Sequence, residues 1–115
     1  MFKQDYIMRQ IQQLVQALVK ILFNIDADST SSALIQDMET KAAADDLLRK
    51  IDSGNIHEAE NELSELLENR TMDNLLVGIV FYSYLNEKDD QHLEIHDFSR
   101  AEVESGIKHL LSEYG

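Results

Sequence analysis

Hydrophobic positions are densest between residues 75 and 85, where only a glycine and a serine interrupt large side chains. A run this apolar has to be enclosed on nearly every side, and its β-branched and aromatic residues would also suit a buried strand. We favour a helix over 71–86, because Thr71 can cap its start and the flanking segments are typical of helices that offer no partner strand. The pattern therefore predicts a fold organised around one central helix.

Apolar residues recur at alternating spacings of four and three near the start of the chain, which predicts a helix over 3–23. The seam consists of Ile7, Ile11, Leu14, Leu18, Ile21 and Ile25. Further apolar residues beside it make this face wider than one neighbouring helix requires. An ordinary core-facing helix and a helix that pairs with a second copy of the chain both fit the pattern. The second interpretation predicts a homodimer with an interface formed by Ile7, Ile11, Leu14, Val15, Leu18 and Leu22.

The remaining pattern predicts further helices separated by polar connections. Residues 24–31 are expected to form a loop and to be the part of the chain most prone to disorder. The later elements are expected to be helices at 32–52, 55–69, 71–86 and 99–113, and a polar loop at 87–98. Gly54 and Asn55 can form a tight turn and a helix cap, which would make the two flanking helices antiparallel. The fold class is therefore all-α, with five main helices in antiparallel hairpins.

The chain has 115 residues, which is enough for a single domain, 1–115, with one hydrophobic core. It contains no cysteine and no proline. The lack of cysteine excludes thiol catalysis, disulfide scaffolding and thiolate metal sites, and it fits a reducing compartment. The pattern shows neither a signal peptide nor a membrane span. We therefore expect a cytoplasmic protein with no membrane association.

Charge separates the first helix from the rest of the chain. The formal net charge is -12, yet residues 1–23 contain three basic and only one acidic side chain. An acidic surface repels phosphates, so we expect no binding to nucleic acid. Solubility is the simplest interpretation of the acidity, and a basic protein partner is the alternative.

The densest group of potential ligands lies in the expected loop 87–98 and comprises His92, Glu94, His96 and Asp97. An extended segment would place the first three on one face, and mixed imidazole and carboxylate ligands suit zinc or another divalent metal. An exposed loop in an acidic protein also collects such residues through composition alone. No cofactor is predicted apart from this divalent metal, and no catalytic motif is present. A non-enzymatic interaction module is therefore the preferred interpretation, and a metal-binding protein or metal-dependent enzyme is the alternative.

Two resemblances add to this picture. Residues 54–67 resemble the second half of a tetratricopeptide repeat, because Gly54, Ala59 and Leu63 have similar spacing. This resemblance implies stacked helical hairpins. It covers only a short part of the chain, and the segment before it lacks the first half of the repeat.

The second resemblance spans most of the chain. Residues 1–11 contain the pattern Met-Phe-x-x-Asp-Tyr-x-x-Arg-Gln-Ile, and blocks at 51–55, 78–82 and 97–102 accompany it. With these blocks the chain resembles an uncharacterised family of small proteins from anaerobic Gram-positive bacteria. The resemblance implies a helical, bacterial, cytosolic protein. Because that family is known only as a domain of unknown function, it implies no activity and no catalytic residues.

Overall fold

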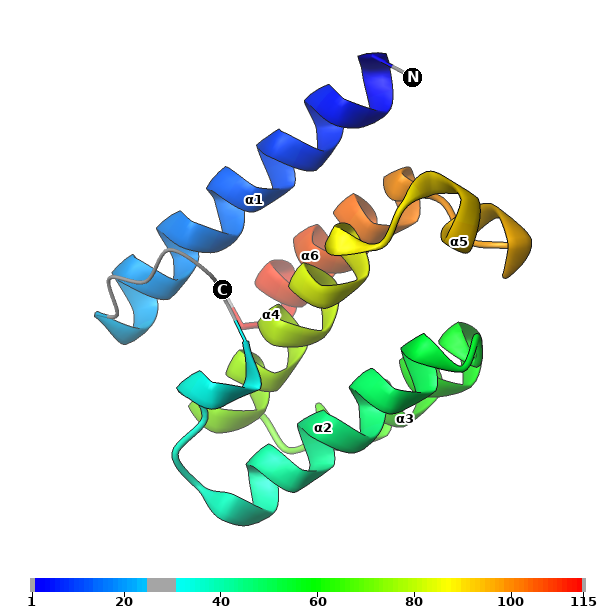
Figure 1. Cartoon of the computed structure of the whole chain (residues 1–115). Coiled ribbons are helices and arrows are strands. Elements are labelled where there is room, and N and C mark those ends of the chain that lie inside the picture. The colour runs from blue at the N-terminus through cyan, green and yellow to red at the C-terminus, as the bar shows by residue number, and fades with distance from the viewer. Residues whose placement is uncertain (1, 25–30, 115) are drawn as a thin grey trace.

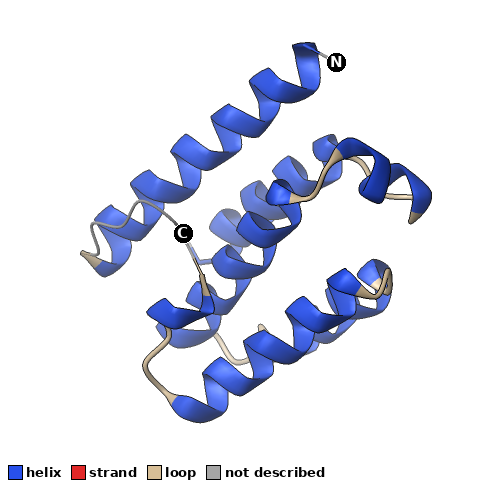
Figure 2. Cartoon of the chain, viewed as in Figure 1, coloured by secondary structure: helices blue, strands red, loops and turns tan. Residues whose placement is uncertain are grey.

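A computed structural model describes residues 2–24 and 31–114. Within these residues all regular structure is helical, so the all-α prediction is confirmed (Figures 1 and 2). The elements are α1 (Phe2–Phe23), η1 (Ser32–Leu34), α2 (Met38–Asp52), α3 (Ile56–Leu66), α4 (Met72–Glu87), α5 (Asp90–Ile95) and α6 (Arg100–Tyr114). The loop expected over residues 24–31, with the disorder expected there, falls largely on residues 25–30, which lie outside the described residues. Ile25, the last residue of the predicted seam, lies there too.

The helices form three layers around α4 (Figure 1). α4 and α6 pack together in the middle, α1 covers one side of both, and α2 covers the other side of α4 with α3 packed against it. Every residue from Asn74 to Tyr82 is buried, as the apolar run predicted. The hydroxyl of Thr71 accepts a hydrogen bond from the Asn74 amide at 3.1 Å, so the predicted cap of the central helix is confirmed.

The helix expected over 32–52 begins later, at Met38. Asp37 is the cap, because its carboxylate accepts hydrogen bonds from the Thr40 amide at 2.9 Å and from the Thr40 hydroxyl at 2.7 Å. These bonds lower the pKa of Asp37, since they favour its ionised form. The serine at position 31 caps only the short 3-10 turn. Two capping signals therefore follow each other, and the second one starts the long helix.

The connections on either side of α3 also differ from expectation. Gly54 takes the predicted positive φ of 90°. Asn55 makes no side-chain capping bond, which corrects the predicted capping role of this residue. α3 ends at Leu66, earlier than expected, because the Asn74 side chain donates to the Leu66 and Asn69 carbonyls at 3.1 and 2.7 Å. These two bonds close the turn into α4.

The segment expected as a polar loop over 87–98 contains the short helix α5, so that expectation is wrong for 90–95. Asp89 caps this helix by accepting a hydrogen bond from the His92 amide at 2.7 Å. Leu93 and Phe98 are buried, whereas Ile95 is 68% exposed. An extended segment would have turned Leu93 and Ile95 to the same face, whereas the helix separates them and buries only Leu93.

A buried arginine joins the helices at one end of the layers. Arg100 is only 3% exposed, and its guanidinium donates hydrogen bonds to the main-chain carbonyl of Asn86, to that of Lys88 at 2.8 Å and to the Asp90 carboxylate at 2.8 Å. The Asn86 side chain in turn donates to the Met8 carbonyl at 3.0 Å. The network therefore connects α6 with α4, α5 and α1.

Candidate functional site

The helical form of α5 rearranges the four residues predicted to bind a metal. Residues four apart on a helix share a face, whereas residues two apart do not. His92 and His96 therefore lie together, with ring centroids 4.6 Å apart, and Glu94 is exposed on another face. The shared face predicted for an extended segment is wrong because the segment is helical.

Both of these histidines already bind the backbone. His92 Nε2 donates to the Ile51 carbonyl at 3.2 Å, and His96 Nδ1 donates to the His92 carbonyl at 2.8 Å. The fourth predicted ligand, Asp97, accepts a hydrogen bond from His57 through its main-chain carbonyl at 3.1 Å. Across the described part of the chain, no three metal-binding side chains are grouped so that they could hold an ion. His92 thus connects α5 to the last turn of α2, and the bond of His96 stays within its own segment.

The residues predicted at a dimer interface on α1 divide into three groups. Ile11 and Val15 are 1% and 2% exposed and belong to the core of the chain itself, so their assignment to a subunit interface is wrong. Ile7, Leu14 and Leu18 are half-buried and pack against that core from its edge. Leu22 is exposed near the end of the helix. α4 and α6 cover the centre of the wide apolar face and leave its margin open.

An uncharged strip of α1 remains exposed beside this margin. Its exposed residues, at spacings of four, three, four and four, are Tyr6, Gln10, Gln13, Ala17 and Ile21. Ile21 is 76% exposed. We call this strip, together with the half-buried Ile7, Leu14 and Leu18, the α1 edge. It carries no ionisable carboxylate or amine, in contrast to the acidic remainder of the chain.

A cavity of about 400 Å³ lies between α3, α4 and α6. Its apolar wall is formed by Leu63 and Leu67 of α3 and the turn after it, Tyr82 of α4, and Leu110 of α6. We call it the α3–α6 hollow. This size falls within the range of about 300–1,000 Å³ that is typical of sites for small molecules.

Gly106 explains how α4 and α6 form one side of the hollow. A Cβ atom at this position would overlap the ring of Tyr82, so only glycine lets the ring lie against α6. This glycine therefore permits the close approach of α4 and α6. The Tyr82 hydroxyl donates to the Glu60 carboxylate at 2.9 Å. Burial, and then the adjacent Glu60 charge, raise the pKa of Tyr82, so the ring stays neutral.

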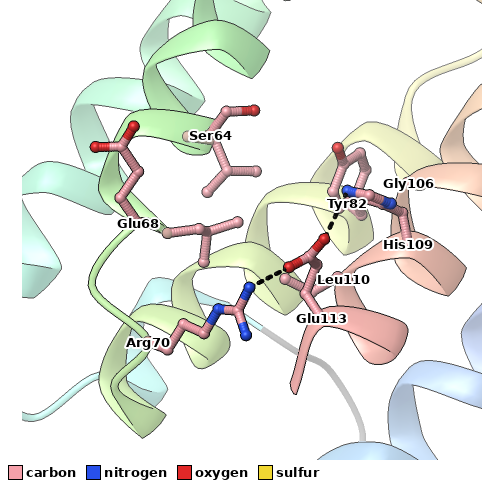
Figure 3. Close-up of a pocket in the computed structure, with 10 residues that line it drawn as sticks. Ser64, Glu68, Arg70, Tyr82, Gly106, His109, Leu110 and Glu113 are labelled. Carbon is pink, nitrogen blue, oxygen red and sulfur yellow. Dashed lines mark hydrogen bonds and ion pairs between the residues drawn. The ribbon is translucent and has the colours of Figure 1, made fainter. Parts of the chain in front are cut away.

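Charged side chains stand at the mouth of the hollow (Figure 3). The Glu113 carboxylate lies between Arg70 and His109 and accepts a hydrogen bond from Arg70 Nη2 at 2.6 Å. Its other oxygen is 3.6 Å from His109 Nε2. Ser64 and Glu68 complete the rim, and the Glu68 carboxylate points away from the hollow. The site therefore combines an apolar wall with the paired charges of Arg70 and Glu113 at its opening, beside His109 and Glu68.

The comparisons with known proteins place the chain without assigning an activity. A family model, described as a family of unknown function (DUF6483), matches residues 1–115. The chain belongs to this family. No curated protein and no solved structure matches this DUF6483 chain. No described helix of this DUF6483 member is long and apolar enough to span a bilayer.

The local sequence pattern did not reveal the hollow. Arg70 and Glu113 are 43 residues apart and meet only after α4 and α6 have packed. Tyr82 belongs to the apolar run 75–85, which predicted its burial but not its bond to Glu60.

Proposed function

We propose that the protein is a non-enzymatic assembly module that forms a homodimer through the α1 edge. The observation that carries this proposal is the uncharged, partly apolar strip described above, which lies on an otherwise acidic molecule. Exposed apolar surface of this kind is typical of protein interaction sites.

Charge supports a second copy as the partner. Each chain has a net charge of -12, and residues 24–115 contain 21 acidic and seven basic side chains. Two copies therefore repel each other over most of their surfaces, and the α1 edge is the face on which they can meet without bringing carboxylates together. A basic foreign protein would instead be attracted to the acidic helices.

The spacing of the edge residues supports a symmetric dimer. Ile7, Leu14 and Ile21 recur every seven residues, as in helices that pair side by side. If Leu14 lies on a two-fold axis between antiparallel copies of α1, each Ile7 meets the Ile21 of the second copy. The same patch then serves both chains, as a two-fold interface requires. A single pair of helices buries little surface, so we expect a dissociation constant on the order of micromolar.

The test compares two exposed isoleucines by light scattering after gel filtration, over about 5–200 μM protein, a range that brackets the expected affinity. Ile21→Glu would place a carboxylate in the interface of each chain and should give a monomer. Ile95→Glu is the matched control, because Ile95 is similarly exposed but lies on α5. The control should remain a dimer like the wild type. A wild type that is monomeric throughout this range, or equal behaviour of the two variants, would contradict the proposal.

A cytoplasmic location is part of the same proposal. The complete lack of cysteine fits a compartment in which disulfides would not form. Immunoblotting of fractionated cells of the source organism tests this, and recovery of the protein outside the cytosolic fraction would argue against it.

A further inference from the structure

The α3–α6 hollow has features that self-association through α1 does not use. Its wall is apolar, and its rim places a guanidinium and a carboxylate side by side at solvent. We propose that the hollow binds a small zwitterion with an apolar side chain, which is the chemical class of the hydrophobic α-amino acids.

The wall selects the apolar part of the ligand. Leu63, Tyr82 and Leu110 are buried residues that line the cavity, and Leu67 is half-buried beside them. None of these four side chains can satisfy a charged group, and the Tyr82 hydroxyl is already bound to Glu60. A branched aliphatic or aromatic side chain can therefore fill the hollow and remove apolar surface from water.

The rim selects the charged part of the ligand. A guanidinium has five N–H donors, and within the described residues Arg70 uses one of them, toward Glu113. The remaining donors can form bidentate hydrogen bonds to a ligand carboxylate. Glu113 can accept a ligand ammonium in addition to Arg70, because a carboxylate has about four acceptor positions.

The pairing of the two rim charges favours a ligand that carries both signs. Arg70 and Glu113 have side-chain exposures of 61% and 42%, so their mutual ion pair is weak and opens readily. A ligand with only a carboxylate would lie beside Glu113 and be repelled by it. A ligand with only an ammonium would lie beside Arg70 and be repelled in the same way. A zwitterion satisfies both groups and leaves the charge of the site unchanged.

The first experiment titrates the full chain with four small molecules and follows the amide resonances of Ser64, Gly106 and Leu110 by NMR. L-leucine should shift these resonances in a saturable manner. 4-methylpentanoate lacks the ammonium and 3-methylbutylamine lacks the carboxylate, so each should bind at least about tenfold more weakly. L-alanine lacks the apolar side chain and should also bind more weakly.

The second experiment removes the two charges at the rim. Arg70→Met and Glu113→Gln should each weaken L-leucine binding about tenfold or more. The matched controls are Lys108→Met and Glu104→Gln, because these residues form another ion pair, at 3.8 Å, on α6 but outside the lining of the hollow. The control variants should bind L-leucine like the wild type. Far-UV circular dichroism of all four variants should match the wild-type spectrum.

Three results would overturn the proposal. The first is the absence of shifts around the hollow with L-leucine at about 20 mM, a concentration far above the dissociation constants usual for so small a ligand. The second is equal binding of L-leucine and the two singly charged analogues, because the rim charges would then select nothing. The third is equal loss of binding in the rim and control variants.

Discussion

Tyr82 links the packing of two helices to the wall of the hollow. Its ring occupies the space that Gly106 leaves open on α6, and its hydroxyl reaches Glu60 on α3. A single residue of α4 thus contacts two further helices, α3 and α6. Ionising the phenol would place a negative charge in a buried position next to a carboxylate, which is why the pKa of Tyr82 is raised.

This raised pKa predicts a loss of stability in alkali. The phenol ionises near pH 10 in the unfolded chain and at higher pH in the folded one. The contribution of Tyr82 to the free energy of unfolding is therefore fully present below pH 10. It falls by up to about 1.4 kcal/mol per pH unit as the pH rises toward the folded-state pKa.

Urea denaturation between pH 9 and pH 11.5 would measure this loss. Tyr82→Phe has no phenol to ionise, so its stability should fall less steeply above pH 10 than that of the wild type. Tyr6→Phe is the control, because it removes a phenol that is exposed rather than packed between helices. The same slope in the wild type and in Tyr82→Phe would show that the ring is solvated in the folded protein.

Among the helices, the Arg100 network holds α5 and α6 to the end of α4. Arg100 supplies donors to the carbonyls of Asn86 and Lys88, which lie at the C-terminus of α4 and have no partner within that helix. It also binds Asp90 at the start of α5. Removing the guanidinium would leave buried acceptors unsatisfied.

We predict that Arg100→Met lowers the free energy of unfolding by about 2–4 kcal/mol. Arg100→Lys should recover only part of this loss, because one ammonium group cannot reproduce the planar fork of donors. Arg49→Met serves as control, since Arg49 forms an exposed pair with Asp46 at 3.0 Å and its loss should change stability by less than about 0.5 kcal/mol. Urea denaturation of the three variants at neutral pH provides the measurement, and equal effects of Arg100→Met and Arg49→Met would refute the role of the network.

Periodicity predicted the long helices well because their apolar residues repeat over several turns. α1 and α4 begin and end within a residue or so of their expected limits. α5 was missed because the alternation of Leu93 and Ile95 imitates a strand, and six residues are too few to show a helical period. The start of α2 was placed too early because Ser31 and Asp37 are both good caps, and only the hydrogen bonds of Asp37 identify the real one.

At the scale of the whole molecule, one face of α1 is buried against other helices and the other face is exposed. Ile11 faces the layer of α4 and α6, whereas Ile21 lies on the α1 edge. We predict that Ile11→Glu destabilises the fold by more than about 3 kcal/mol, because it buries a carboxylate among apolar side chains. Ile21→Glu should leave the free energy of unfolding within about 1 kcal/mol of the wild type while changing the oligomeric state.

Thermal unfolding followed by circular dichroism, at a concentration where both variants are monomeric, separates these effects. Similar midpoints for Ile11→Glu and Ile21→Glu would mean that α1 does not pack on the core as described. The sequence alone predicted an apolar face of α1 wider than one neighbouring helix requires, but it could not say which of its residues would be buried and which exposed. That division depends on how closely α4 and α6 approach, which is set by residues such as Gly106 far along the chain.

The candidate site depends still more on long-range packing. Arg70 follows α3 and Glu113 lies near the end of α6, so no local window of the sequence contains both. The family match covers the whole chain but brings no function with it. Predicting the hollow would have required the relative positions of three helices, which hydrophobic periodicity does not provide.

The layered arrangement also has a consequence for synthesis on the ribosome. α1 is made first, yet the two helices that pack against it, α4 and α6, are made in the second half of the chain. At about 5–20 residues per second, roughly 4 to 18 s separate the translation of Val19 from that of Ile107 on α6. Until both α4 and α6 have been made, the apolar face of α1 lacks its complete cover from its own chain. Nascent chains on neighbouring ribosomes of one messenger RNA can therefore meet through α1 before either has completed its core.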